Sequence, residues 1–256
     1  YKIFINYLLE RFQIIPLSIL VASDILVIYR ITYNQNILIW KYVIYFMFVI
    51  LYLFHNRLAD DRRDYDFDKK FYPNRAVQKG LISLRQINNL SYIAIFLMVI
   101  IAGSFSFLSL AIFTLLILYT LVAKKDFFLP KDFKEKHLFV YNFLNMLQIL
   151  SLQIFIYVSI INSLDFTHFI YSHILFVFIL SIQVEISRKI KPEISLANDL
   201  YSDRMGMGRS IILWGVFGIF SIINSAYLAY IIGIQLNTIL FLEFICLLYT
   251  SPSPRD

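Results

Sequence analysis

Long apolar blocks alternate with shorter polar segments along almost the whole chain. Several of these blocks approach the ~20 residues that a helix needs to cross the hydrocarbon core of a bilayer, and none shows the alternation of barrel strands. Because only helices and closed barrels satisfy the backbone in lipid, the pattern predicts an all-α, polytopic transmembrane bundle. The expected spans cover residues 12–30, 39–56, 89–106, 107–123, 138–161, 168–184, 210–232 and 238–250. The amphipathic residues 1–11 are expected to lie at the membrane surface.

Composition agrees with this class and excludes a soluble domain. Of the 256 residues, 59% are hydrophobic and only 16% are charged. The single cysteine, Cys246, excludes an internal disulfide and a cysteine-based metal site. It lies in the segment 246–256, which resembles a translated sequencing adapter and is expected not to be native. We therefore expect one transmembrane domain over residues 1–245, with native sequence missing at both ends.

The basic residues predict how the chain is oriented. The segments 57–88, 124–137 and 185–209 contain 18 of the 23 lysines and arginines, whereas the turns near residues 104 and 164 contain none. This alternation is the positive-inside pattern, which places the N-terminus and the three basic loops in the cytoplasm and the spans in the cell membrane. The net charge of +6 is thus explained by topology and gives no indication of nucleic-acid binding.

The polar segment 56–83 directly follows a predicted span and is rich in acids. Its carboxylates are Asp60, Asp61, Asp64, Asp66 and Asp68. On a helix, Asp61, Asp64 and Asp68 share one face, and Asp60 joins it through its i+4 relation to Asp64. Clustered carboxylates repel one another and favour a cation, and hard oxygen ligands suit Mg²⁺ bound together with a phosphate group. The alternative is a solvated loop whose interleaved lysines and arginines neutralise the acids.

A second acidic segment, residues 185–210, ends a span four spans further on. Its acids include Glu185, Asp199 and Asp203, and its bases include Arg188 and Lys189. Asp199 and Asp203 stand at i and i+4 and share a helical face. Two such segments on one side of the membrane indicate two related halves around a central cavity, where the acids could hold two Mg²⁺ ions on one diphosphate. Chance placement of two charged loops is the alternative.

The first acidic segment resembles the signature of UbiA-type intramembrane prenyltransferases, N-D-x-x-D-x-x-x-D followed by a basic-proline turn and a glycine. Aligned on Arg75 and Gly80, the acids of the family fall on Asp61, Asp64 and Asp68. The chain departs from the family pattern at two positions. Asp60 stands in place of the asparagine, which keeps an oxygen ligand, and Ala76 stands in place of the proline.

The second segment is similar to the second motif of the family, D-x-x-x-D with a nearby glycine. Asp199 and Asp203 match its acids, and Gly206 or Gly208 matches its glycine with imperfect spacing. In a variant of this region an Arg-Lys pair and a Glu precede the motif, so Glu185 could be the main acid instead. The segment 119–128 is similar to the family loop in which a tyrosine and basic residues approach the diphosphate.

The resemblance implies Mg²⁺-dependent transfer of a prenyl group from a prenyl diphosphate to a lipophilic, most often aromatic, acceptor. It implies catalytic roles for Asp61, Asp64, Asp68, Asp199 and Asp203, and metal binding by these five acids together with Asp60 and Glu185. The residues implied in diphosphate binding are Arg75, Tyr119, Lys124, Arg188 and Lys189. The family usually has nine helices, of which eight are expected in this chain.

Two other functions compete with this interpretation. A CDP-alcohol phosphotransferase would require a D-G-x-x-A-R string, which the chain lacks. A transporter or scaffold would use the charged loops only to bind partners or anionic lipid. Two polar residues have simple structural interpretations: His55 is expected at the membrane interface, and Asn142 is expected to form hydrogen bonds between helices.

Overall fold

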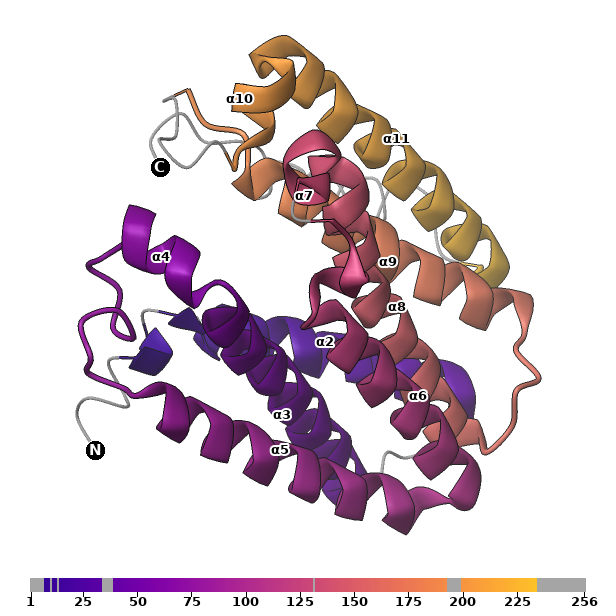
Figure 1. The fold of residues 1–256 in the computed structure, drawn as a ribbon. Helices are drawn as coiled ribbons and strands as arrows, with labels where there is room; N and C mark the ends of the chain where they lie inside the picture. The colour runs from indigo at the N-terminus through magenta and orange to yellow at the C-terminus, as the bar shows by residue number, and fades with distance from the viewer. Residues whose placement is uncertain are drawn as a thin grey trace. The chain divides into compact units, whose positions relative to one another are not determined.

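The computed structural model describes residues 7–9, 11, 12, 14–33, 39–130, 132–192 and 199–233. All regular structure in these residues is helical, which confirms the predicted all-α class (Figure 1). The chain forms two compact units. Unit 1 contains Tyr1–Phe128 and Phe155–Leu164, and unit 2 contains Leu129–Ile154 and Asp165–Asp256.

The helices divide between the two units as follows. Unit 1 contains α2 (Ile14–Tyr33), α3 (Ile39–Arg63), α4 (Tyr65–Phe71), α5 (Leu84–Phe105), α6 (Phe107–Ala123), the 3₁₀ turn η1 (Asp126–Phe128) and the end of α8 (Leu138–Ile161). Unit 2 contains α7 (Phe133–Lys136), the rest of α8, α9 (His168–Arg188), α10 (Tyr201–Met205) and α11 (Met207–Ile232).

Seven of the eight expected spans are helices in the structure, and the eighth, 238–250, lies outside the described residues. Five helices, namely α3, α5, α8, α9 and α11, are long and apolar enough to cross a membrane, while α2 and α6 carry shorter apolar stretches. This is therefore a polytopic membrane protein. The largest difference from expectation is at the end of α3, which continues seven residues beyond residue 56 and carries the first acids.

Helix α3 is the central helix of unit 1. Its Phe48 stacks on Phe155 of α8 at 4.4 Å between ring centroids and meets Phe113 of α6 edge-on at 5.4 Å. Its Tyr45 hydroxyl donates a hydrogen bond to the carbonyl of Ser159, 2.9 Å away. The aromatic packing, which adds specific geometry to apolar burial, holds α3 against α6 and the end of α8.

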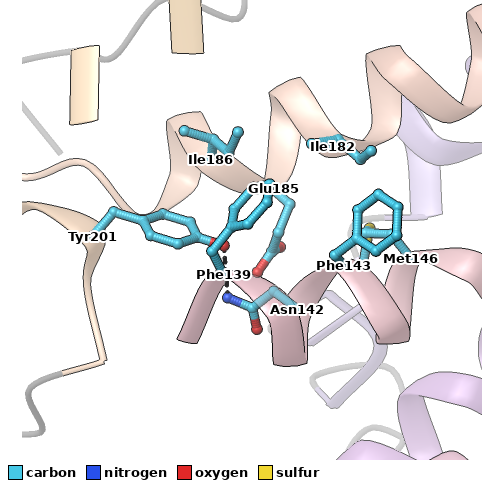
Figure 2. A pocket seen from close by; sticks show the side chains of 8 residues that line it. All are labelled: Phe139, Asn142, Phe143, Met146, Ile182, Glu185, Ile186 and Tyr201. Carbon is cyan, nitrogen blue, oxygen red and sulfur yellow. Dashed lines mark hydrogen bonds between the residues drawn. The ribbon is translucent and has the colours of Figure 1, made fainter. Parts of the chain in front are cut away.

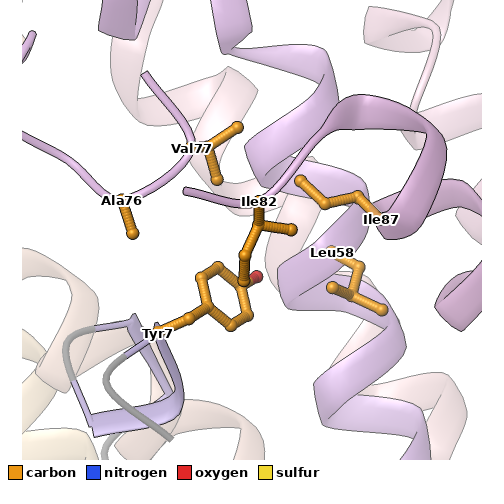
Figure 3. Packing of buried hydrophobic residues seen from close by; sticks show 6 residues of the cluster. All are labelled: Tyr7, Leu58, Ala76, Val77, Ile82 and Ile87. Carbon is orange, nitrogen blue, oxygen red and sulfur yellow. The ribbon is translucent and has the colours of Figure 1, made fainter. Parts of the chain in front are cut away.

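The loop between α4 and α5 is held down by an apolar cluster shown in Figure 3. Ala76, Val77 and Ile82 of the loop are buried, together with side chains from α3, from α5 and from the segment before α2. The members of the cluster are Tyr7, Leu58, Ala76, Val77, Ile82 and Ile87. This packing fixes the loop next to the acidic end of α3.

In unit 2, α9 packs along α11, and a buried cluster joins the ends of α8 and α9 to α10. Phe178, Ile182 and Ile186 follow one face of α9 and meet Leu138 of α8 and Tyr201 of α10. The chain passes from α10 into α11 at Gly206, which has a φ of +82°. Glycine is the residue that adopts this conformation without strain.

Candidate functional site

The first acidic segment forms two helices with a single-residue break between them. Asp64 lies between α3, which ends at Arg63, and α4, and has φ −90° and ψ 12°. The Asp64 amide still donates to the carbonyl of Asp60 at 2.9 Å, and the Asp68 amide donates to that of Asp64 at 2.8 Å. The helical spacing expected for the acids is thus kept across the break, although their carboxylates divide into two groups.

Asp61 and Asp68 form the first group and are almost completely buried, with relative exposures of 1% and 3%. Arg11, which lies before α2, reaches both of them. Its Nη2 lies 2.5 Å from Oδ1 of Asp61 and 3.4 Å from Oδ2 of Asp68, and its Nε donates to Asp61 at 3.2 Å. Two carboxylates seven residues apart therefore converge on one cationic nitrogen.

Further donors complete this group, which we call the Arg11 cluster. Asp61 accepts a hydrogen bond from the Tyr7 hydroxyl at 2.7 Å and pairs with Nη2 of Arg57 at 3.0 Å. Asp68 pairs with Arg75, whose guanidinium also lies 4.0 Å over the ring of Tyr72. Burial, followed by the charge of Asp61, raises the pKa of Tyr7 far above its ordinary value, so its hydroxyl remains a donor.

Asp60 and Asp64 form the second group around Arg63. The Arg63 guanidinium binds both oxygens of Asp64, at 3.2 and 3.0 Å, and its Nη2 lies 3.0 Å from Asp60. Asp126 of η1 lies 3.7 Å from its Nε. This Arg63 cluster therefore links the end of α3 to the loop after α6. Its acids are more exposed than those of the Arg11 cluster, at 43% for Asp60 and 28% for Asp64.

The Arg11 cluster has the donor chemistry of a magnesium site. Mg²⁺ is usually bound through one or two carboxylates, with water and substrate phosphates completing its shell. Asp61 and Asp68 supply two carboxylates within reach of a single cation, which is at present the Arg11 guanidinium. Among the residues that the structure describes, no three acids or histidines come together as a metal-binding group. The fit therefore rests on two carboxylates and not on the four that share the expected face.

The loop between α4 and α5 accounts for two positions of the first motif, Gly80 and Ala76. Gly80 has a φ of +73°, and its amide donates to the carbonyl of Val77 at 3.0 Å in a tight turn. A left-handed residue is needed there, which accounts for a glycine. Ala76, where the family has proline, is 2% exposed and fills the cluster shown in Figure 3, so the departure is accommodated by packing.

Lys124 lies at the end of α6 and points into unit 1. Its Nζ lies 3.1 Å from Nε2 of His55 on α3. His55 is fully buried among the helices, which its position near the end of an apolar run did not indicate. Burial, followed by the nearby charge of Arg62, lowers the pKa of Lys124 to about 8. Tyr119, one turn earlier, packs against the ring of Phe127, 5.8 Å away between centroids.

The second acidic segment lies in unit 2, where Glu185 is in the last turn of α9 (Figure 2) and Lys189 directly follows the helix. Lys189 Nζ lies 3.1 Å from Oε1 of Glu185 and donates to Oδ1 of Asn142, also at 3.1 Å. The Asn142 amide donates in turn to the Tyr201 hydroxyl at 2.8 Å. Glu185, Asn142 and Tyr201 line a small hollow, which is far smaller than a complete lipid substrate requires.

Polar side chains join α8, α9 and α10 through Lys189 and Asn142, and Figure 2 shows the bond from Asn142 to Tyr201. Tyr201 is 1% exposed, and burial raises the pKa of its hydroxyl well above its ordinary value. Asn142 makes the hydrogen bonds between helices expected of it, to Tyr201 and Lys189. Arg188 lies 3.7 Å from Glu185 and is largely exposed.

Asp199 and Asp203 are half-buried and lie before and within α10, on a different element from Glu185. The pair expected at i and i+4 on one helix therefore straddles the start of α10, which begins at Tyr201. Of the two candidate glycines, Gly206 has a positive φ, whereas Gly208 lies within α11. The structure thus supports Gly206 as the motif glycine.

Sequence reasoning missed the residues that hold the acids. Tyr7 and Arg11 belong to the segment assigned to the membrane surface, and their partners lie about 50 residues away. Arg63 was expected only among the interleaved bases of the first acidic segment, and no role was expected for Asp126. The available signal was the presence of basic residues beside acids in a protein with few charges. That signal predicts that acids and bases form ion pairs, but it does not identify which residues pair.

Comparison with known proteins gives one informative result. No protein-family model matches the chain, and no curated protein matches it. The solved structure of digeranylgeranylglyceryl phosphate synthase in membranes is similar to it, with a TM-score of 0.62 over 98% of this chain and 87% of that one, at 19% sequence identity. At this identity the likeness establishes the fold. The chain has the fold of the UbiA-type intramembrane prenyltransferases, the family that its first acidic segment resembles.

Proposed function

We propose that the protein transfers a prenyl group from a prenyl diphosphate to a lipophilic acceptor in the membrane. One observation carries the proposal: Asp61 at the end of the candidate span α3 and Asp68 on α4 are both buried and converge on one cationic nitrogen. A buried pair of carboxylates aimed at one cation suits a metal–diphosphate complex better than it suits a lipid-binding loop. The shared fold with a prenyl-transferring synthase supports the same function.

The basic residues of unit 1 suit the leaving group. Cleavage of the C1–O bond leaves negative charge on the diphosphate, which must be met by fixed donors in a site with little water. The guanidinium of Arg75 is held in place by its ion pair with Asp68 and its contact with the Tyr72 ring, so its planar set of donors is oriented to bind phosphate oxygens. Lys124 adds a compact ammonium at the end of α6. The allylic cation formed at C1 is then attacked by the acceptor.

We propose Asp61 and Asp68 as the principal metal ligands. Mg²⁺ held by them would supply positive charge to the diphosphate oxygens. Asp60 and Asp64, held by Arg63, are proposed as further ligands that become available when the charge of Arg63 is shared with the diphosphate.

The acids of unit 2 are proposed as a second set of ligands for a metal–diphosphate complex. Glu185 already holds a cation, Lys189, and its side chain is only 13% exposed. We therefore propose Glu185 as the main acid of the second segment, with Asp199 and Asp203 as additional ligands. Lys189, Arg188 and Tyr119 are proposed as diphosphate contacts.

Two classes of acceptor are compatible with the proposal, an aromatic ring and a lipid alcohol. The sequence resemblance favours an aromatic ring. The structurally similar synthase is named for a glyceryl phosphate product, so a lipid alcohol is also a reasonable acceptor. Both classes depend on the same cation at C1, and only the acceptor assay separates them.

The test is prenyl transfer by the purified protein in detergent. It uses labelled prenyl diphosphates of several lengths, aromatic and lipid-alcohol acceptors, and reactions with Mg²⁺ or with EDTA. Asp61→Asn and Asp68→Asn, which keep shape and remove charge, should each lower the transfer rate by about a hundredfold or more. Asp66→Asn, at an exposed acid of the same segment, is the matched control and should retain the wild-type rate.

Metal-dependent transfer that is lost in both variants and kept in the control would establish the function. Folded protein that releases no diphosphate and transfers no prenyl group across the whole panel would refute it. The non-catalytic transporter or scaffold would then be the better account.

A further inference from the structure

Two buried polar groups, His55 and Ser91, lie behind Lys124 in unit 1. His55 of α3 is 0% exposed, and its two ring nitrogens each have a partner. Nε2 lies 3.1 Å from Nζ of Lys124, and Nδ1 lies 3.0 Å from the hydroxyl of Ser91 on α5, which is 8% exposed. A fully buried histidine with both nitrogens engaged has one fixed ring orientation.

The partners also determine the direction of each hydrogen bond. A lysine ammonium has three donors and no acceptor, so Nε2 of His55 accepts its proton. The proton of the neutral ring is then on Nδ1, which donates to the Ser91 hydroxyl. A charged imidazolium in this place would put two cations 3.1 Å apart in a buried site, so the neutral ring is the stable form.

We propose that His55 is a positioning residue that holds the ammonium of Lys124, through Nε2, in the place where it meets the diphosphate. The inference rests on the proposed function, because it gives Lys124 the substrate named there. His55 does not touch the substrate; it acts by fixing the direction and charge of Lys124.

The surroundings explain why Lys124 needs such a partner. Helix α3 presents Arg62 and Asp60 to Lys124, the first opposing its charge and the second favouring it. Helix α5 presents neutral groups at this place, and its Asn88 accepts a hydrogen bond from Arg62 at 2.8 Å. Burial and Arg62 together lower the pKa of Lys124 to about 8. An acceptor that favours the charged form therefore matters most near neutral pH.

The backbone of Lys124 is fixed independently of His55. Its amide donates to the carbonyl of Thr120 at 2.9 Å, and the Thr120 hydroxyl lies 3.0 Å from the hydroxyl of Tyr52. Loss of the His55 ring should thus leave the end of α6 in place and free only the Lys124 side chain. The effect of a variant can then be read as an effect on that side chain.

The experiment compares His55→Phe, which keeps ring volume and removes the acceptor, with His55→Gln, which keeps an acceptor. His137→Phe, at an exposed histidine of unit 2, is the matched control. Binding of inorganic pyrophosphate with Mg²⁺ is measured by calorimetry between pH 6 and 9. The KM for prenyl diphosphate and kcat are measured over the same range, and thermal unfolding checks the fold of each variant.

In the wild type, pyrophosphate binding should weaken as the pH rises through about 8, because Lys124 loses its proton there. In His55→Phe the charged lysine loses its acceptor, so the pKa of Lys124 falls. The weakening of pyrophosphate binding, which is the alkaline limb of the pH profile, then moves to lower pH. At pH 7.5 the KM should rise roughly tenfold with a smaller change in kcat. His55→Gln should behave nearly as the wild type does, and the control should not differ from it.

An alkaline limb in His55→Phe that stays where it is in the wild type would overturn the inference. An equal loss in His55→Gln would also overturn it, since a variant that keeps an acceptor would then be no better than one that lacks it. If His55→Phe does not fold, Ser91→Ala provides the test, because loss of the Nδ1 partner should move the limb in the same direction. If the loss of pyrophosphate binding at alkaline pH moves in His55→Phe but the wild-type protein transfers no prenyl group, the inference about His55 stands and the proposed function is refuted. If the protein transfers prenyl groups but this pH dependence does not move, the proposed function stands and the inference is refuted.

Discussion

Replacing Arg11 by methionine should destabilise the protein in EDTA and should strengthen metal binding at the Arg11 cluster. Methionine keeps the length and apolar stem of the arginine and removes its charge and donors. In the wild type, Arg11 binds Asp61 through two nitrogens and reaches Asp68 through one of them. Both carboxylates are buried, so the lost guanidinium is not replaced by bulk water.

The size of the effect can be worked out from the geometry. Removing one partner of a buried ion pair costs about 3–5 kcal/mol because the other charge is left without compensation. Here the compensation is only partly lost, since Arg57 remains 3.0 Å from Asp61 and Arg75 still pairs with Asp68. The side chain of Arg11 is 12% exposed, so screening by water reduces the cost only slightly. We expect a loss of about 2–3 kcal/mol.

The assay measures unfolding in detergent by intrinsic fluorescence, with EDTA and with increasing Mg²⁺. Binding of Mn²⁺ to the protein without substrate is followed in parallel by electron paramagnetic resonance. In the variant, the metal takes the place vacated by the guanidinium, so Mn²⁺ should bind at least about tenfold more tightly than in the wild type. Mg²⁺ should then restore much of the lost stability. Arg85→Met, at an exposed arginine of α5, is the matched control.

Two results would refute this reasoning. If the Arg11 variant is as stable as the wild type in EDTA, the ion pairs to Asp61 and Asp68 do not compensate buried charge. If the variant is less stable but binds Mn²⁺ no better, the two carboxylates do not form a cation site, and the proposed ligand roles fail with it.

Two further predictions concern local structure. Gly80→Ala should lower stability by about 1–2 kcal/mol in thermal unfolding, because the left-handed φ of +73° is strained for alanine. A Cβ at Gly80 would meet nothing within 4 Å, so the cost is purely conformational; Gly103→Ala in α5, equally unobstructed, should not destabilise, and equal losses at both sites would contradict the argument. Tyr201→Phe should cost about 1 kcal/mol, because the Asn142 amide loses its buried acceptor at 2.8 Å. A double-mutant cycle with Asn142→Ala should show coupling between the two, and strictly additive losses would disprove the contact.

The spans were predictable because their signal is local. Runs of apolar residues long enough for a bilayer become helices wherever they occur, and seven such runs are helices here. The extension of α3 to Arg63 was harder to predict, because the apolar run ends near residue 56 while the helix continues through polar residues. Side-chain pairs at helical spacing stabilise that extension: Arg57 pairs with Asp61 at i+4, and Asp60 pairs with Arg63 at i+3.

The acids of the site were predictable as a set, but their division was not. Spacing places Asp61, Asp64 and Asp68 on one helical face, yet only Asp61 and Asp68 share a cation. The division depends on Arg11, which is distant in sequence and becomes a neighbour only when α2 packs on α3. The same limit applies to His55, whose burial depends on the helices around it and not on its position near the end of an apolar run.

The bond between Arg11 and Asp61 also limits how the chain can be threaded through a bilayer. A direct contact requires both residues on the same side of the membrane, so the number of crossings between residues 11 and 61 must be even, and α2 with α3 provides two. The contact of Lys124 with His55 extends this parity rule through α5 and α6. A reporter placed before Tyr7 and another in the loop after Lys124 should therefore face the same compartment, whichever compartment that is.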